Sequence, residues 1–253
     1  MVIVLLGVVM CVKNEEYYLP GFIKHIKKYV DCFVVLDDGS TDNTKAILAK
    51  EAKVIKIIDS NKENPDIWDE PVNRKKLLNE AYKLGVKVVL CCDPDERFEK
   101  NFLVNLKKLK NNCQEHNLVY GLHFRELYGR YNQYRYDELW NQKTKFILFP
   151  LKENMIFDKT YFQRLHISWY YDDLEERKEL TKYNLYHLKM IKEQERNKRK
   201  ELYEKIDPEK KLQKVGYNYL TEMEGIKIKR IPFTKKYDYL SIPSDLKNYK
   251  ENI

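Results

Sequence analysis

Short apolar runs alternate in the first half of the chain with segments whose apolar residues recur three or four positions apart. The runs have the length of strands and span residues 8–12, 32–36, 54–58 and 86–92. The segments between and after them present one apolar face and one face rich in lysine, which is typical of helices on the surface of a sheet. Strands and helices that alternate in this way predict a doubly wound, mostly parallel α/β sheet with right-handed connections.

The pattern changes after residue 118. Two further runs, residues 119–128 and 145–149, are typical of strands, and a loop rich in aromatic and charged residues separates them. From His187 onward the chain indicates a highly charged helix, then a break at Pro208 and a short amphipathic strand. We therefore expect one α/β domain over residues 1–185 and a small helical extension over residues 186–253.

The fourth apolar run ends abruptly in acidic residues. Asp93, Asp95 and Glu96 lie within four positions, at the carboxyl end of a strand that we expect to be buried on both faces. Carboxylates this close repel one another unless they share a cation. Mg²⁺ and Mn²⁺ prefer such oxygen ligands and complete their shells with diphosphate oxygens, and open α/β sheets bind ligands at this edge. The alternative is an acidic turn that leads into a helix beginning near Glu99.

Polar residues also follow the first two strands. Asn14 and Glu15 end the first strand, and Asp37 and Asp38 end the second. At the carboxyl edge of a parallel sheet these side chains would accept hydrogen bonds from a nucleobase or a ribose, although turn formation and helix capping are the alternative roles. Arg74 opens a later helix, where its guanidinium suits a diphosphate oxygen or simply faces solvent.

Composition limits the partners and the compartment. The 253 residues suffice for one large domain with an appendage. The net charge of +8 suits an anionic ligand, but lysine is spread too evenly to indicate nucleic acid. Five cysteines without C-x-x-C spacing indicate a reduced, cytoplasmic protein. The apolar N-terminus is too short to span a bilayer, so we expect no transmembrane segment, and peripheral contact with a membrane stays open.

Four motifs, in this order and spacing, resemble the nucleotide-sugar-binding half of the family 2 glycosyltransferases: CVKNEE, VVLDDGSTDNT, VNRKK and LCCDPDERF. The resemblance covers residues 8–98 and weakens toward residue 150. It implies the GT-A fold, with a nucleotide-sugar-binding half over residues 1–115 and an acceptor half over residues 116–185. It also implies a nucleotide-diphosphate sugar as donor, with a UDP-sugar as the preferred candidate, and Mn²⁺ or Mg²⁺ as cofactor. The implied reaction is inverting transfer to a hydroxyl of a glycan or lipid-linked acceptor.

The resemblance also suggests roles for single residues. It places Asp93 and Asp95 in the metal motif, with Asp95 as the direct ligand, and it gives Asp93 a place beside the bound nucleotide sugar. His187 is a further candidate metal ligand, because a histidine downstream of the acidic turn has that role in several GT-A enzymes. A histidine between leucines, as in NLYHLKM, is otherwise a core residue.

Inverting transfer needs a general base that takes the proton of the acceptor hydroxyl. Our first candidates are Asp137 and Glu138, beside Trp140, and the second choice is the pair Asp172 and Asp173; aromatic neighbours suit a sugar acceptor, which stacks on rings. The base signatures usual in the family are not recognisable here. Two alternatives therefore stay open. One is a GT-A domain that binds a nucleotide sugar or carbohydrate without activity, and the other is a sugar nucleotidyltransferase.

Overall fold

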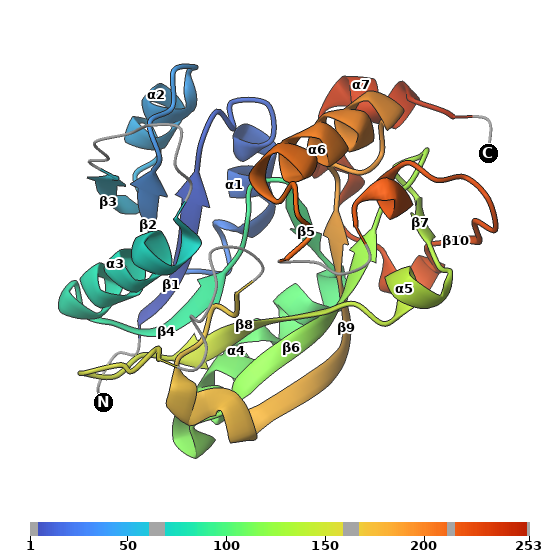
Figure 1. Ribbon diagram of the computed structural model, residues 1–253. Helices are drawn as coiled ribbons and strands as arrows, with labels where there is room; N and C mark the ends of the chain where they lie inside the picture. Colours follow the sequence, from blue (N-terminus) through green and yellow to red (C-terminus); the bar gives the residue numbers. More distant parts are fainter. Residues whose placement is uncertain (1–4, 61–68, 159–166, 212–215, 252–253) are drawn as a thin grey trace.

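The computed structural model describes residues 5–60, 69–158, 167–211 and 216–251 (Figure 1). An eight-stranded sheet with the order β3-β2-β1-β4-β8-β6-β9-β5 forms its centre. Its strands are β1 (Leu5–Val12), β2 (Cys32–Asp37), β3 (Val54–Asp59), β4 (Val86–Cys91), β5 (Glu96–Phe98), β6 (Val119–Glu126), β8 (Thr144–Pro150) and β9 (Lys178–His187). Strands β5 and β8 run opposite to the other six. The predicted α/β fold with a mostly parallel sheet is confirmed.

The remaining elements flank this sheet or follow it. Strands β7 (Gln133–Arg135) and β10 (Ile228–Arg230) form a separate antiparallel pair. The α-helices are α1 (Leu19–Ile26), α2 (Thr44–Ala49), α3 (Glu70–Lys83), α4 (Lys100–His116), α5 (Glu138–Asn141), α6 (Glu193–Ile206) and α7 (Ser244–Asn248). The 3₁₀ turns are η1 (Asp172–Arg177), η2 (Asn218–Leu220), η3 (Phe233–Lys235) and η4 (Tyr239–Ser241). Among the described residues no helix is long and apolar enough to cross a membrane.

The first half of the chain folds as its apolar pattern predicts. Strand β2 is buried along its whole length, because helices cover the sheet and leave it no polar face. Helix α1 carries Pro20 in its first turn, where the missing N–H costs nothing. Helix α3 begins after Asp69, whose side chain accepts the backbone N–H of Val72 at 3.1 Å.

Strand β9 is the main element that the sequence did not predict. Six of its ten residues are exposed or half-buried, and only Asn184–His187 is buried, so its apolar signal is short. The charged helix that we expected from His187 begins later, at Glu193. The predicted boundary between the α/β domain and the C-terminal extension, after residue 185, falls inside β9, two residues before the strand ends.

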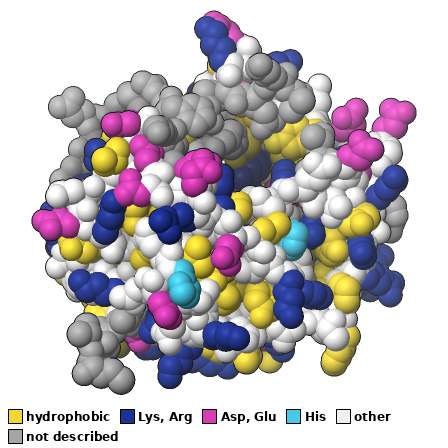
Figure 2. Space-filling view, turned by 90° about the horizontal axis from the view of Figure 1, so that it is seen from below, with side chains coloured by type: hydrophobic (Ala, Val, Ile, Leu, Met, Phe, Trp, Pro, Cys, Tyr) yellow, Lys and Arg dark blue, Asp and Glu magenta, His cyan; other side chains and the backbone are white. Residues whose placement is uncertain are grey.

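The strand ends determine where the site lies. Because β1, β2, β4, β6 and β9 run in parallel, their carboxyl ends lie at one edge of the sheet, the upper edge in Figure 1. The register pairs Glu126 at the end of β6 with His187 at the end of β9. The antiparallel β5 places Glu96 opposite the same histidine. Figure 2 shows the molecule from below, at the amino ends of these strands, where acidic and basic side chains are intermixed.

The C-terminal segment completes the structure around Arg97, which is fully buried. Its Nη2 donates to the carbonyl oxygens of Ser241 at 2.8 Å and Tyr18 at 3.2 Å, and its Nη1 donates to that of Pro94 at 2.8 Å. Helix α1 packs closely here, because a Cβ on Gly21 would come within 2.0 Å of the Ser241 carbonyl oxygen. One guanidinium therefore joins the turn after β4 to both α1 and η4.

Because His25 on α1 is buried, we predict that the protein loses stability in acid. His25 is 3% exposed, and its Nε2 accepts the backbone N–H of Phe98 at 2.8 Å. Burial, and then the charge of Arg97, hold the pKa of His25 well below 6.5. Since the unfolded chain then takes up the proton first, this contribution is complete above about pH 6.5 and is lost as the pH falls below it.

Urea unfolding of the wild type and of His25→Gln tests this expectation, because glutamine can still accept the Phe98 N–H. Between about pH 7.5 and 5.5 the wild type should lose about 1.4 kcal/mol more free energy of unfolding than the variant. Subtracting the free energy of unfolding of the variant from that of the wild type at each pH cancels the contributions of the other titrating groups, which the two proteins share. Parallel pH profiles would mean that the pKa of His25 is not lowered in the folded state.

Candidate active site

Asp95 and His187 meet at the carboxyl edge of the sheet, although 92 positions separate them in the sequence. His187 Nε2 lies 3.0 Å from Asp95 Oδ2. The backbone supports this arrangement, because the N–H of Leu188 donates to the Asp95 carbonyl oxygen at 2.8 Å. The side chains of Asp95 and His187 are buried, with 7% and 4% of their surface exposed. Two of the three predicted metal ligands are therefore in contact.

Glu126 occupies the other side of the imidazole. Its Oε2 is hydrogen-bonded to Nδ1 of His187, and its Oε1 lies 3.3 Å from the ammonium of Lys143. A carboxylate on Nδ1 keeps a proton there and leaves Nε2 to face a ligand. Arg199 from α6 also reaches this point, with its Nη1 3.3 Å from Nε2 of His187.

The charges of this cluster shift the pKa values of its members. Burial alone would lower the pKa of His187, but the carboxylates of Glu126 and Asp95 raise it to about 9. Burial raises the pKa of Asp95, but His187 and then Lys189 outweigh it and hold this pKa below its ordinary value. The histidine and both carboxylates are therefore charged at neutral pH while no cation binds between them.

The residues present fit a divalent cation. Asp95 Oδ1 is buried and has no hydrogen-bond partner, as expected of an oxygen that faces a ligand. With Nε2 of His187 it supplies two protein ligands, and Mg²⁺ or Mn²⁺ sites that bind diphosphate take most of the remaining ligands from phosphate and water. No group of three or more His, Cys, Asp or Glu side chains in the described residues forms a metal site by itself.

Glu15 lies beside this pair. The ammonium of Lys189, two residues after His187, lies 3.2 Å from Glu15 Oε1 and 3.8 Å from Asp95 Oδ2. Burial raises the pKa of Glu15 to about 7, even though Lys189 lowers it. Glu15 Oε2 is buried without a hydrogen-bond partner. The polar end of β1 and the acidic turn after β4 therefore share one lysine.

Asp93 forms an ion pair with Lys145 on β8. The ammonium of Lys145 lies 2.8 Å from Asp93 Oδ2 and 2.5 Å from Glu96 Oε1. Glu96 is almost fully buried, and its Oε2 accepts the backbone N–H of Asp93 at 3.0 Å. The carboxylate of Asp93 is 41% exposed, so it remains accessible to a ligand from solvent.

Asp37 and Asp38 have different surroundings at the end of β2. Asp37 Oδ1 accepts the backbone N–H groups of Gly39 at 3.1 Å and Ser40 at 2.9 Å. Gly39 has φ +83°, a backbone conformation that favours glycine, so this carboxylate stabilises the turn. Asp38 is 2% exposed, and its Oδ1 accepts from Nδ2 of Asn73 on α3 at 3.2 Å.

Asn14 joins the loop after β1 to the loop after β2. Its Oδ1 accepts the backbone N–H of Thr41 at 2.8 Å, and its own N–H donates to Ser40 Oγ at 3.0 Å. Its φ of 55° is one that asparagine adopts more readily than most residues. The adjacent Glu15 N–H donates to Thr44 Oγ1 at 2.8 Å. The two loops therefore hold one another in place.

Arg74 faces the chain that precedes η1. Its Nη1 donates to the carbonyl oxygen of Ile167 at 2.5 Å, and its guanidinium lies 4.3 Å from the ring centroid of Trp169. Glu70, one turn earlier on α3, lies 3.3 Å from its Nη2. These contacts occupy the side chain in this conformation, and its role at a diphosphate stays a prediction.

The first pair of candidate bases lies near the end of β6. Asp137 precedes α5, and its Oδ2 lies 2.5 Å from Nε of the buried Arg135. Glu138 is exposed. Trp140 is fully buried, and the ammonium of Lys143, which also contacts Glu126, lies 4.0 Å from its ring centroid. The expectation that Trp140 offers a stacking surface to a sugar was wrong, since its ring packs in the core with Met190 and Tyr217.

The structure does not bring the second pair of candidate bases to this site. Asp172 and Asp173 lie in η1, just before β9 begins at Lys178, whereas His187 ends that strand. The strand has 10 residues and is roughly 30 Å long. Asp173 forms an ion pair with Lys152 there. The pair therefore lies toward the opposite edge of the sheet.

Sequence reasoning missed several residues of this cluster, namely Glu126, Lys145, Lys189 and Arg199. Each is a charged residue in a segment with other charged residues, so no local pattern distinguishes it. The available signal was the register, because a strand ending at His187 beside β6 would have placed Glu126 next to it.

The sequence matches one protein family, described as Glycosyl transferase family 2, over residues 7–177. The chain belongs to this family. The match contains the ends of β1, β2 and β4, and therefore Glu15, Asp38 and Asp95. His187, Lys189 and Arg199 lie beyond the matched residues.

Solved structures of two other proteins are similar to parts of this family 2 protein. S. aureus TarS in complex with UDP-GlcNAc is 23% identical, with a TM-score of 0.38, and the match covers 49% of this chain and 36% of that chain. Glucosyl-3-phosphoglycerate synthase from Mycobacterium tuberculosis, in complex with Mn²⁺, UDP and glucosyl-3-phosphoglycerate, is 20% identical with a TM-score of 0.35. That match covers 48% of this chain and 44% of that chain. A search of curated proteins found no match.

Proposed function

We propose that the protein transfers a sugar from a nucleotide-diphosphate donor to a hydroxyl of a glycan or lipid-linked acceptor, with inversion at the anomeric carbon. A UDP-sugar is our preferred donor. Membership of family 2 supports the reaction class. The observation that carries the proposal is the contact between Asp95 and His187, with Asp95 Oδ1 buried and unpartnered beside it.

Asp95 and His187 are the residues that would hold Mn²⁺ or Mg²⁺. When bound, the cation neutralises charge on the diphosphate oxygens. Asp95 would contribute Oδ1 and His187 would contribute Nε2, while Glu126 keeps the proton of the imidazole on Nδ1. Asp93, which is accessible from solvent, would contact the donor from the same turn.

Lys189 and Arg199 would bind the departing diphosphate. Both lie within 3.8 Å of an atom of the Asp95–His187 pair, so a diphosphate bound there comes within their reach. Fixed cations of this kind stabilise the negative charge that develops on a leaving group and need no reorganisation during the reaction. Asp37, Asp38, Asn14 and Glu15 would line the nucleoside end of the donor, at the ends of β1 and β2.

For the general base we propose the region of α5, with Glu138 or Asp137 taking the proton of the acceptor hydroxyl. The helix lies close to the cluster, because Lys143 contacts both Trp140 of α5 and Glu126. Glu138 is exposed, and an incoming hydroxyl can therefore reach it.

A hydrolysis screen tests the proposal. Many glycosyltransferases slowly hydrolyse their donor, so the protein is incubated with UDP-, GDP- and dTDP-sugars in the presence of Mn²⁺. We expect release of the nucleoside diphosphate from one group of donors, and its loss in EDTA. Absence of both hydrolysis and binding for every donor would contradict the proposal, whereas binding without hydrolysis would favour the alternative of an inactive domain.

Glu126→Gln should weaken the metal site without unfolding the protein. Glutamine has the same shape but no negative charge to hold the proton on Nδ1 of His187, and losses of such partners typically cost about 10–100-fold in metal affinity. The paramagnetic resonance signal of free Mn²⁺, titrated in the presence of UDP, measures this affinity directly. Glu179→Gln, an exposed change on the same strand as His187, is the matched control. An unchanged affinity in Glu126→Gln would exclude this role.

A further inference from the structure

The most exposed large apolar side chains of the described residues come from three neighbouring elements. Phe233 in η3 is 82% exposed, and Leu240 in η4 and Val104 in α4 are each 71% exposed. Single exposed apolar residues are common on a protein that needs no partner, whereas a group of them on adjoining elements indicates a contact surface.

Hydrogen bonds hold these elements side by side. The backbone N–H of Lys100 donates to the Lys236 carbonyl oxygen at 2.9 Å, and Nδ2 of Asn101 donates to the Thr234 carbonyl oxygen at 2.7 Å. The start of α4 therefore lies against the segment that joins η3 to η4. Val104 follows Lys100 by one helical turn and shares its side of the helix.

Lys236 lies among the apolar side chains of this surface. Its ammonium is 4.3 Å from the ring centroid of Phe233 and 5.7 Å from that of Tyr239, the neighbour of Leu240. The turn η4 also contacts α1, since there is no room for a Cβ on Gly21 of α1 beside the Ser241 carbonyl oxygen. Helix α4, the turns η3 and η4, and helix α1 therefore adjoin one another in this order.

Exposed lysines accompany Val104 on α4 and extend along α1. Exposed lysines on α1 and α4, or next to these helices, are Lys24, Lys27, Lys28, Lys100, Lys107 and Lys108. Lys28 and Lys100 both lie close enough to His25 to lower its pKa. Glu99, at the start of α4, is fully buried and does not offset these charges at the surface.

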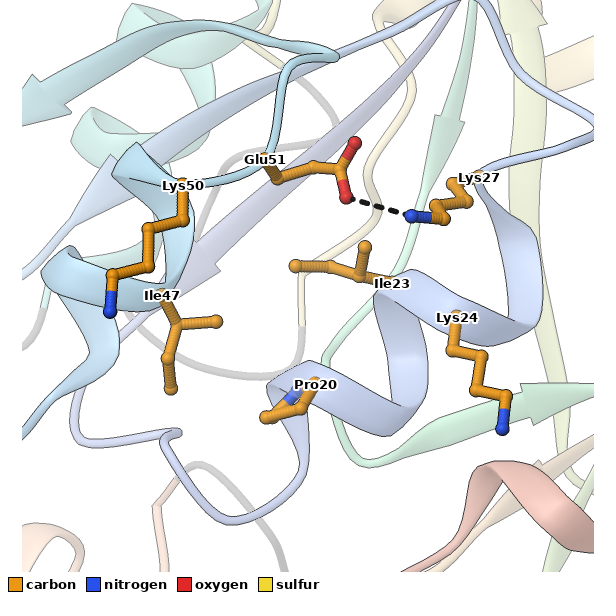
Figure 3. Close-up of a pocket in the computed structure, with 7 residues that line it drawn as sticks. All are labelled: Pro20, Ile23, Lys24, Lys27, Ile47, Lys50 and Glu51. Atoms are coloured by element: carbon orange, nitrogen blue, oxygen red, sulfur yellow. Dashed lines mark hydrogen bonds and ion pairs between the residues drawn. The ribbon is translucent and has the colours of Figure 1, made fainter.

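A hollow of about 340 Å³ extends this basic surface on the other side of α1, toward α2 (Figure 3). Its lining consists of Pro20, Ile23, Lys24, Lys27, Ile47, Lys50 and Glu51. In Figure 3 the apolar side chains lie between the two helices, and Lys24 and Lys50 stand on opposite sides of them. Lys27 forms an ion pair with Glu51 at 3.3 Å. The ammonium groups of the other two lysines in the lining, Lys24 and Lys50, can therefore interact with an anionic ligand.

We propose that this face, with Val104, Phe233 and Leu240 as its apolar tips, docks on an anionic lipid bilayer. The lysines would contact lipid phosphates, and the three tips would enter the boundary between headgroups and acyl chains. The charge complementarity also suits nucleic acid, but a phosphate backbone offers nothing that would bury an exposed leucine or valine. The hollow between α1 and α2 would accept a headgroup.

Vesicle flotation of the full chain tests this proposal. We expect at least tenfold stronger binding to vesicles of phosphatidylcholine with about 30% phosphatidylserine than to phosphatidylcholine alone, and release by high salt because exposed charges are then screened. The triple variant Val104→Ser, Phe233→Ser and Leu240→Ser should lower binding to the anionic vesicles at least tenfold. Val72→Ser, which changes an apolar side chain on α3 that is 60% exposed, is the matched control.

Three outcomes would overturn the proposal. They are no binding to anionic vesicles at low salt, equal binding to both kinds of vesicle, and wild-type binding by the triple variant. Analytical ultracentrifugation separates the main competing explanation: a dimer that the triple variant abolishes, together with absent vesicle binding, would assign this face to a second copy of the chain. The variants change exposed side chains, so unchanged thermal unfolding confirms that they remain folded.

Discussion

His187→Ala should reduce sugar transfer about 10²–10³-fold and weaken Mn²⁺ binding in the same variant. The side chain supplies one of two proposed protein ligands, and a cation at a diphosphate contributes several kcal/mol of charge stabilisation in the transition state. Asp95 would also lose the charge that balances it, because Oδ2 lies 3.0 Å from the imidazole. Initial rates and the resonance signal of free Mn²⁺ measure the two effects.

The matched control for this variant is His116→Ala. His116 is exposed at the end of α4, so its loss should change neither rate nor metal affinity. If His187→Ala keeps full Mn²⁺ affinity and transfer, His187 is a core histidine that pairs with two carboxylates. A variant that melts at a much lower temperature would be replaced by His187→Gln, which preserves more of the packing.

Arg97→Leu should destabilise the fold by roughly 3–5 kcal/mol. The change leaves the buried carbonyl oxygens of Ser241 and Pro94 without the Arg97 donor, whereas that of Tyr18 keeps the backbone N–H of Phe22 at 3.0 Å. Each unsatisfied buried group costs about 1–3 kcal/mol. Arg97→Lys should recover only part of this loss, because an ammonium cannot reach three separate acceptors with the geometry of a guanidinium. Urea unfolding measures both variants.

Gly21→Ala tests the same contact from the side of α1, since its Cβ would meet the Ser241 carbonyl oxygen. Arg177→Leu is the matched control, because Arg177 is exposed and its loss should change stability by no more than about 0.5 kcal/mol. Wild-type stability in both Arg97→Leu and Gly21→Ala would show that the C-terminal segment is not needed to hold the turn that carries Asp95.

The apolar pattern was sufficient to predict the parallel half of the sheet, because its inner strands β1, β2 and β4 are largely buried and read as continuous apolar runs. Strand β2 is an example, with all six residues buried. Strand β9 escaped prediction because its first residues are polar and half-buried or exposed, and β5 because it has three residues. Both belong to the side of the sheet where pairing with distant segments decides the structure.

The candidate site could be predicted where its residues directly follow apolar strands. Asp38 and Asp95 were found in this way, and His187 came from a resemblance. Glu126 and Arg199 could not be found, since their positions depend on the register of β6 with β9 and on where α6 crosses the edge of the sheet. The burial of Trp140 likewise depends on contacts with residues 50 or more positions away.

The central claim is that Asp95 and His187 form a metal-dependent site for a nucleoside diphosphate, and calorimetry with UDP tests it most directly. The wild type should bind UDP at least tenfold more tightly with Mn²⁺ than in EDTA, a difference of about 1.4 kcal/mol. Asp95→Asn should bind UDP equally in both conditions, because it loses the charge of the ligand without losing its shape. Equal UDP affinity of the wild type with Mn²⁺ and in EDTA would contradict the account.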